Sequence, residues 1–314
     1  MRQTAGGCHF PSDSASAYCL LHTNYRMAAT VSVNGRISSE RDASVSVFDH
    51  GFLYGEGVYE TLRTYNARPF LYDRHMRRLR RSAEMIALPV PFSDDELAGN
   101  IRETMAAASL AGHEAYIRVL VTRGVGELTY DPRATPTPTV VIIVKPQIDP
   151  PPEAYADGVR VAIVEIIRNH PASVNPMIKC NNLMNSALAM QQALRRGAFE
   201  GVMRNYRGEL TECTTSNLFI VKGGAALTPP LDAGLLPGIT REFLFEIARD
   251  IGIPMREETL RDEDFYGAAE AFLTGTTRGV LPITAVDDRT IATGKPGPVT
   301  LKLLAAFRRA AAAT

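Results

Sequence analysis

The chain has 314 residues, of which 45% are hydrophobic, and its 34 basic and 34 acidic residues give a formal net charge of zero. A chain of this length can bury a full core in two lobes or in one large α/β unit. The balanced charge argues against nucleic acid or an acidic membrane as the main partner, and no apolar run approaches the ~20 residues that cross a bilayer.

The N-terminal stretch and the cysteines indicate the setting of the protein. Residues 1–28 are rich in Ser, Ala and Gly and contain no apolar segment suited to a signal peptide, so we expect a disordered extension. The four cysteines have neither CxxC nor metal-ligand spacing, which predicts no metal site and free thiols in a reducing cytoplasm. They are Cys8, Cys19, Cys180 and Cys213.

Residues 29–145 are predicted to form a small α+β domain. Residues 30–39 and 55–72 each indicate a β-hairpin, the first with Asn34-Gly35 at its turn. Two helices follow, one predicted to begin after an Asp73 N-cap and one capped by Ser93 with Glu96 three places on. Apolar strands at 115–124 and 137–146 complete an antiparallel sheet with two helices.

A proline-rich segment, 146–156, is the predicted interdomain linker, and 157–314 the predicted large domain. Its expected elements are strands at 159–166, 201–206, 216–224 and 270–275, a helix that begins at Lys179, a helix at 238–252 closed by Gly252, and a terminal helix at 297–313. A further loop is expected after 275. The strands and helices alternate without a regular βαβ repeat and without GxGxxG, which favours an α+β or mixed α/β fold over a Rossmann fold.

Lys179 is one of only five lysines in a chain with 29 arginines. At the first turn of the predicted helix it would face the positive end of the helix dipole, and the neighbouring Met177, Ile178 and Leu183 would add desolvation. Both effects disfavour the ammonium form and leave a nucleophilic amine, which a guanidinium cannot provide. The alternative is a surface lysine whose stem lies along apolar neighbours.

Three further features match the chemistry of a pyridoxal phosphate site. Glu212 follows a predicted hairpin turn and is either a buried acid or an exposed turn residue. Gly238, Ile239 and Thr240 lie at a predicted helix N-terminus, and the Gly/Thr-rich loop 273–279 leaves a strand, so each can bind an anion through backbone N–H groups. A lysine, a carboxylate and two phosphate cradles are the groups that pyridoxal phosphate requires.

At eight stretches in consistent order the chain resembles the class IV, or fold-type IV, pyridoxal-phosphate-dependent aminotransferases. The resemblance spans about 31–307 and implies a fold like that of D-amino acid aminotransferase, with two α+β lobes and the cofactor between them. It also implies a homodimer whose loops complete each other's sites. The stretches are 48–63, 75–79, 116–124, 178–183, 210–219, 236–241, 272–283 and 294–300.

The resemblance implies a role for each matching position. Lys179 corresponds to the lysine that bonds to the cofactor and moves a proton, Glu212 to the partner of the pyridine nitrogen, and Arg78 to the phosphate clamp. The other implied cofactor contacts are Gly238, Ile239, Thr240 and Thr276. The implied substrate contacts are Tyr54, Tyr59, Tyr116, Arg118 and Thr277.

The substrate prediction rests on a finer resemblance. The stretches 116–124 and 128–133 resemble branched-chain amino acid aminotransferases, and the RxH pair typical of D-amino acid enzymes is absent after 124. Thr61 and Leu183, however, replace a glycine and a tyrosine usual in branched-chain enzymes. We predict amino transfer between a branched-chain-like L-amino acid and a 2-oxo acid such as 2-oxoglutarate. A D-amino acid transaminase, a 4-amino-4-deoxychorismate lyase and a non-catalytic binding protein are the alternatives.

Overall fold

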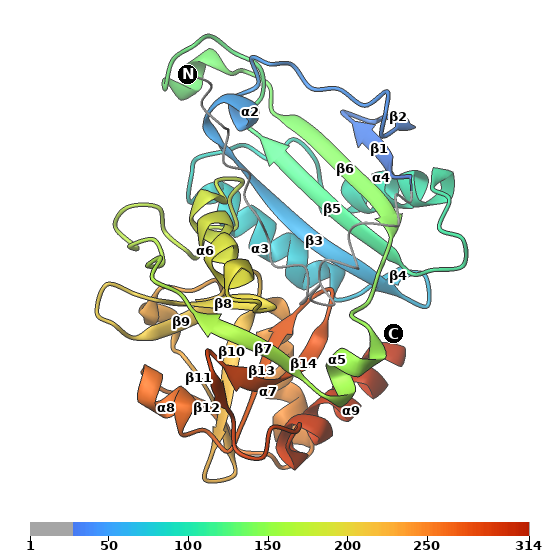
Figure 1. Ribbon diagram of the computed structural model, residues 1–314. Helices are drawn as coiled ribbons and strands as arrows, with labels where there is room; N and C mark the ends of the chain where they lie inside the picture. Colours follow the sequence, from blue (N-terminus) through green and yellow to red (C-terminus); the bar gives the residue numbers. More distant parts are fainter. Residues whose placement is uncertain (1–27, 314) are drawn as a thin grey trace, which may run out of the picture.

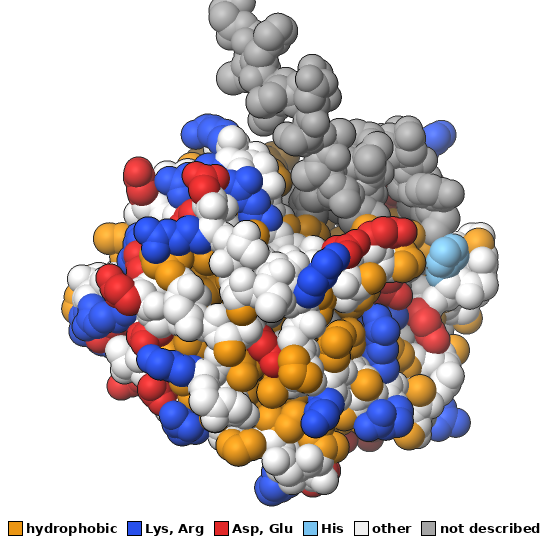
Figure 2. All heavy atoms as spheres, turned by 60° about the horizontal axis from the view of Figure 1, so that its bottom comes forward, with side chains coloured by type: hydrophobic (Ala, Val, Ile, Leu, Met, Phe, Trp, Pro, Cys, Tyr) orange, Lys and Arg blue, Asp and Glu red, His pale blue; other side chains and the backbone are white. Residues whose placement is uncertain are grey.

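Two β-sheets, each with its own helices, organise residues 28–313, which the computed structural model describes (Figure 1). The predicted extension at 1–28 lies outside the described residues except for Ala28. Within the described part of the chain, no helix is long and apolar enough to cross a membrane. On the face that Figure 2 shows, basic and acidic side chains are interspersed, as expected for a chain without net charge.

The first sheet has six strands in the order β2-β1-β6-β5-β3-β4, and all neighbours are antiparallel. Buried and half-buried residues alternate along β5, so one face of the sheet packs on α3 and α4. The strands are β1 (Thr30–Val33), β2 (Arg36–Ser39), β3 (Gly57–Tyr65), β4 (Arg68–Pro69), β5 (Ala115–Thr122) and β6 (Thr139–Pro146). The helices are α2 (His50–Tyr54), α3 (Tyr72–Glu84), α4 (Asp94–Ala107) and the 3₁₀ turn η1 (Pro132–Ala134).

The second sheet has nine strands and mixed directions. Its order is β12-β11-β10-β13-β14-β7-β8-β9, with β15 paired to β14 and β9 also paired to β10. The strands are β7 (Val159–Ile163), β8 (Glu200–Arg204), β9 (Leu210–Cys213), β10 (Asn217–Lys222), β11 (Ala225–Thr228), β12 (Met255–Glu257), β13 (Glu270–Gly275), β14 (Gly279–Val286) and β15 (Arg289–Thr290). The helices are α5 (Pro152–Ala156), α6 (Met184–Arg195), α7 (Ile239–Asp250), α8 (Asp262–Tyr266), α9 (Pro298–Ala312) and the 3₁₀ turn η2 (Leu231–Ala233).

Several local predictions agree with this structure. Asn34 and Gly35 both have positive φ at the first hairpin turn, as a tight two-residue turn requires. Ser93 and Glu96 form the predicted capping box of α4. Gly252, with φ of 71°, follows the end of α7 in the left-handed conformation.

The start of α3 was predicted wrongly. The helix begins at Tyr72, and Leu71, at φ of 52°, is the N-cap in place of Asp73. Phe70 is buried beside Phe307 in the core of the large lobe, the part of the chain built around the nine-stranded sheet. This contact fixes the direction in which the chain enters the helix. Leu71 turns the backbone, and its carbonyl accepts from the N–H of Arg74.

The helix predicted to begin at Lys179 was also wrong, because α6 begins five residues later at Met184. The segment around Lys179 is non-helical: it follows a turn at 176–177 and pairs with the first residues of β3. Cys180 forms an isolated antiparallel bridge with Val58, and the N–H of Tyr59 donates to the carbonyl of Lys179 at 2.9 Å. The dipole argument for Lys179 therefore does not apply. The loop predicted after 275 is a short turn into β14, which the sequence prediction missed.

Candidate active site

A cavity of about 650 Å³ is lined by residues from both sheets. This volume lies within the range of small-molecule and cofactor sites. Nearly all site residues predicted from the sequence line it: Tyr59, Arg78, Tyr116, Arg118, Lys179, Glu212, Gly238, Ile239, Thr240, Thr276 and Thr277. Thr61 and Leu183, which depart from the branched-chain pattern, line it as well. Tyr54 does not line this cavity; its ring packs against His50 and Tyr130.

Lys179 enters the cavity from the non-helical segment that pairs with β3. Its backbone N–H donates to the hydroxyl of Ser82 on α3 at 3.1 Å, so contacts with both β3 and α3 fix its main chain. Its Nζ lies 4.4 Å from the centroid of the Tyr59 ring. The guanidinium carbon of Arg118 lies 4.1 Å from the same centroid, so two cations contact one aromatic ring.

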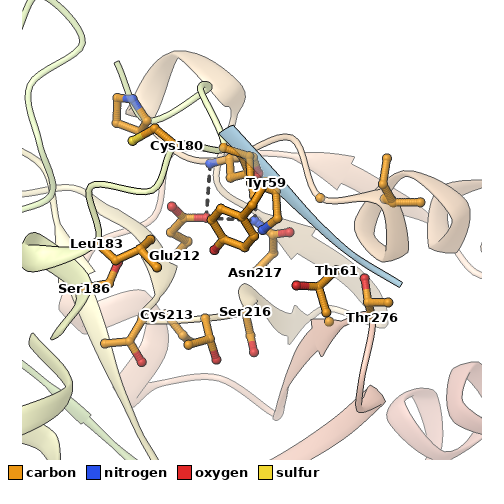
Figure 3. Close-up of a pocket in the computed structure, with 18 of the residues that line it drawn as sticks. Tyr59, Thr61, Cys180, Leu183, Ser186, Glu212, Cys213, Ser216, Asn217 and Thr276 are labelled. Atoms are coloured by element: carbon orange, nitrogen blue, oxygen red, sulfur yellow. Dashed lines mark hydrogen bonds between the residues drawn. The ribbon is translucent and has the colours of Figure 1, made fainter. Parts of the chain in front are cut away.

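Glu212 is a buried carboxylate on β9, and Figure 3 shows it next to Asn217, with which it forms a hydrogen bond. It accepts hydrogen bonds from Arg168 Nε at 2.9 Å, the backbone N–H of Leu236 at 3.1 Å and Asn217 Nδ2 at 3.2 Å. Burial raises the pKa of Glu212, and the charge of Arg168 offsets only part of this effect. The alternative of an exposed turn acid is therefore wrong.

Arg78 reaches the cavity from α3 and is held by a carboxylate behind it. Glu60, with no exposed surface, accepts from Arg78 Nε at 2.7 Å and Nη2 at 2.8 Å, and His75 Nδ1 lies 2.7 Å from the same carboxylate. Arg78 Nη1 donates to the carbonyl of Pro237. Without the resemblance, Arg78 would have been interpreted as a solvated helix residue, but it is buried and its orientation is fixed on three sides.

The two predicted anion cradles lie at this cavity. Gly238 is the N-cap of α7, and a Cβ at this position would lie 1.9 Å from Asn217 Oδ1, so only glycine fits. The free N–H groups of the first turn of α7 are suited to an anion. The second cradle, which contains Thr276, is held where the Thr277 carbonyl accepts from Gln147 Nε2 and Arg63 Nη1.

Sequence reasoning missed the residues that support this site. Glu60 and Glu200 lie on strands and have no motif of their own, and Arg168 and Asn217 become recognisable only through their contacts with Glu212. Nothing in the sequence of either strand sets these carboxylates apart, because β3 also contains Arg63 and β8 also contains Arg204. Among the described cysteines, Cys213 is buried and Cys180 is half-buried at the cavity wall.

Comparisons with known proteins identify the family. The model of the amino-transferase class IV family matches residues 57–286. A putative branched-chain-amino-acid aminotransferase of Methanocaldococcus jannaschii is 39% identical over 276 residues, covering 88% of this chain and 94% of that protein. A D-alanine aminotransferase of Listeria monocytogenes is 34% identical, covering 87% and 93%. The crystal structure of Escherichia coli branched-chain amino acid aminotransferase matches with a TM-score of 0.85 and 33% identity, covering 90% and 94%.

The chain therefore belongs to the class IV aminotransferases, which use pyridoxal phosphate. The predicted family, fold class and cofactor are confirmed, and so is transamination as the type of reaction. Another solved branched-chain amino acid aminotransferase, 29% identical to this chain with a TM-score of 0.85, contains pyridoxamine 5′-phosphate.

The buried Glu60–Arg78 pair generates a prediction about stability. Glu60→Gln leaves the buried guanidinium of Arg78 without its carboxylate, and we expect a loss of about 3–5 kcal/mol in the free energy of unfolding. We expect Asp288→Asn, which removes an exposed ion pair with Arg160, to cost less than about 1 kcal/mol. Urea unfolding of the cofactor-free proteins measures both values; equal effects would contradict the importance of the buried pair.

His75 generates a prediction about pH. Burial lowers the pKa of His75 and outweighs the neighbouring Glu60 carboxylate, so the unfolded chain binds a proton that the folded protein does not. The contribution to stability is present above about pH 6.5 and is lost as the pH falls, by at most about 1.4 kcal/mol per pH unit. His75→Asn, which keeps a donor near the Nδ1 position, should flatten this dependence. Unfolding by urea at pH 7.5, 6.5 and 5.5 tests it, and parallel curves for the two proteins would refute it.

Proposed function

We propose that the protein transfers the amino group of branched-chain L-amino acids to a 2-oxo acid such as 2-oxoglutarate. The observation that carries this proposal is the convergence of Lys179, Glu212 and Arg78, from three separate segments, on one cavity. The branched-chain preference is supported by the names of the M. jannaschii and E. coli relatives.

The residues of the cavity fit pyridoxal phosphate. Arg78 and the first turn of α7 would hold its phosphate from one side and Thr276 from the other, which matches a doubly charged anion. Gly238 lets the N-terminus of α7 pack against Asn217 beside the cavity, since a Cβ at this position would clash with Asn217 Oδ1. Glu212 would bind the pyridine nitrogen, because it is a buried carboxylate whose raised pKa favours sharing a proton.

Bound in this cavity, the cofactor supplies an aldehyde that bonds amines and a ring that accepts electrons. Lys179 would bond to it through Nζ, and once the substrate amine replaces it, the freed Nζ would carry the proton from the substrate α-carbon. Glu212, fixed by Arg168 and Asn217, would hold the proton at the ring nitrogen throughout. Tyr59, Tyr116, Arg118 and Thr277 would bind the substrate, with Arg118 as the cation for its carboxylate.

D-Alanine transamination is the second candidate, because D-alanine aminotransferases of two bacteria are 34% and 32% identical to this chain. Leu183 lines the cavity where branched-chain enzymes usually have a tyrosine. A donor panel of L-leucine, L-valine, D-alanine and D-glutamate, each with 2-oxoglutarate, separates the two candidates. Faster turnover of either D-amino acid would overturn the branched-chain assignment.

We also infer a homodimer. Five large apolar side chains in 47–52 and 128–130 are more than half exposed, and the two segments adjoin because the N–H of Gly126 donates to the carbonyl of Phe48. An exposed apolar cluster of this kind suits a second copy of the chain. The five residues are Val47, Phe48, Phe52, Leu128 and Tyr130. The cytoplasmic location expected from the cysteines stays a prediction.

Replacement of the proposed catalytic lysine tests the function directly. Lys179→Ala should reduce transamination of L-leucine by at least about 10³-fold, because no other amine lines the cavity in the described residues. Lys302→Ala, on the exposed side of α9, is the matched control and should keep full activity. Borohydride reduction followed by peptide mass spectrometry should find the cofactor on Lys179. Undiminished turnover, or label on another lysine, would refute the assignment.

The dimer is tested by charging the apolar cluster. Phe52→Asp introduces a carboxylate at a position whose side chain is 68% exposed in the single chain. The fold should therefore survive, while association of two chains should fail because the carboxylate would be buried between them. Sedimentation equilibrium should give twice the chain mass for the unaltered protein and one chain mass for the variant. A monomeric unaltered protein at micromolar concentration would exclude the inference.

A further inference from the structure

The arginines of the cavity differ in whether their charge is balanced. Among the described residues, four arginines line the cavity, and three of them contact a buried carboxylate: Arg78 contacts Glu60, Arg168 contacts Glu212, and Arg278 contacts Glu200. Arg118 has no acidic partner among residues 28–313 and lies instead on the Tyr59 ring. Two of the balanced pairs belong to the proposed cofactor site, but the third, Arg278 with Glu200, has no role in the mechanism given above.

Glu200 is fully buried on β8, and its partners form one wall of the cavity. Its carboxylate accepts from the hydroxyls of Thr214 at 3.1 Å, Thr215 at 2.6 Å and Ser216 at 2.9 Å, and from the N–H of Thr215 at 3.0 Å. Arg278 Nη1 donates to the same carboxylate and to the hydroxyls of Thr215 and Ser216. Thr214, Thr215, Ser216 and Arg278 line the cavity, whereas Glu200 does not.

The guanidinium of Arg278 can therefore contact a ligand in the cavity, but its positive charge is neutralised by Glu200. Its guanidinium carbon lies 4.9 Å from the centroid of the Phe199 ring, and its side chain is 13% exposed. Its charge and that of Glu200 cancel at a distance, while the guanidinium still provides N–H donors at short range. An arginine without this carboxylate would attract any second carboxylate in the cavity.

A transaminase that uses a branched-chain donor and 2-oxoglutarate must bind an uncharged and an acidic side chain in one cavity. We propose that Glu200, by neutralising Arg278, sets the ratio of the affinities with which this cavity binds substrates with acidic and with uncharged side chains. The inference rests on the proposed function. Arg118 is then the cation free to bind a substrate carboxylate, and a second unbalanced arginine would favour the dicarboxylate at the expense of the aliphatic substrate.

The test compares two unreactive ligands, glutarate and 4-methylpentanoate, on the cofactor-loaded protein. Their dissociation constants, from the change in cofactor absorbance, give a selectivity ratio for the dicarboxylate. Glu200→Gln should raise this ratio roughly tenfold, which is the effect of a unit charge about 10 Å away at an effective dielectric constant of about 20. Glu270→Gln is the matched control: it alters another buried carboxylate, which caps α9 outside the cavity wall, and should lower Tm without changing the ratio.

A second comparison, made in variants that lack the Arg278 guanidinium, separates the effect of the Glu200 charge from that of structural damage. Arg278→Gln and the double variant Glu200→Gln/Arg278→Gln differ only in the carboxylate of Glu200, and the double variant should have the higher ratio. If Glu200→Gln does not fold, this second comparison decides the question. A ratio within twofold of its reference in a folded pair overturns the proposal. Turnover of L-leucine by the unaltered protein is measured separately, so failure of the proposed function is recognised independently of the binding ratio.

Discussion

The site depends on the ion pair between an arginine that lines the cavity and a carboxylate buried behind it. Burial of one charge alone is costly, whereas two charges held at hydrogen-bond distance can remain in the interior with fixed geometry. Burial alone would raise the pKa of Glu60, but Arg78 and His75 outweigh it and hold that pKa well below the usual range, so the carboxylate stays ionised. The guanidinium of Arg78 is thereby aimed at the cavity before any ligand arrives, and the ligand need not pay for ordering a flexible side chain.

The two lobes share the site because short segments of each pair with the other. The residues around Lys179 belong to the large lobe but form hydrogen bonds with β3 of the small lobe. Toward the other end of β3, Arg63 forms an ion pair with Asp149 and donates to the carbonyl of Thr277. Strand β3 therefore positions both the Lys179 amine and the Gly/Thr-rich loop 273–279. Because both are bonded to the same strand, these groups keep a fixed distance from each other although they are far apart in sequence.

The family match supports the type of reaction and the cofactor, whereas the choice of substrate depends on the site. Membership of the class IV aminotransferases and the use of pyridoxal phosphate follow from the family match and from relatives that cover nearly the whole chain. Relatives of similar identity are named for branched-chain amino acids and for D-alanine, so the family alone does not select the substrate. In our proposal, selection depends on the cavity wall, which includes Thr61, Leu183 and Arg278, the last paired with the buried Glu200.

Local sequence determined the features that depend on a few neighbouring residues: the Asn34-Gly35 turn, the Ser93 capping box, the left-handed Gly252, and the motifs around Lys179 and Glu212 that resemble the family. Tertiary structure decided the rest. Leu71 rather than Asp73 precedes α3 because Phe70 is anchored in the other lobe, and Lys179 is non-helical because β3 offers its segment backbone partners. Glu60 and Glu200 acquire a role only through residues distant in the chain, since a carboxylate's function depends on which cations folding brings beside it.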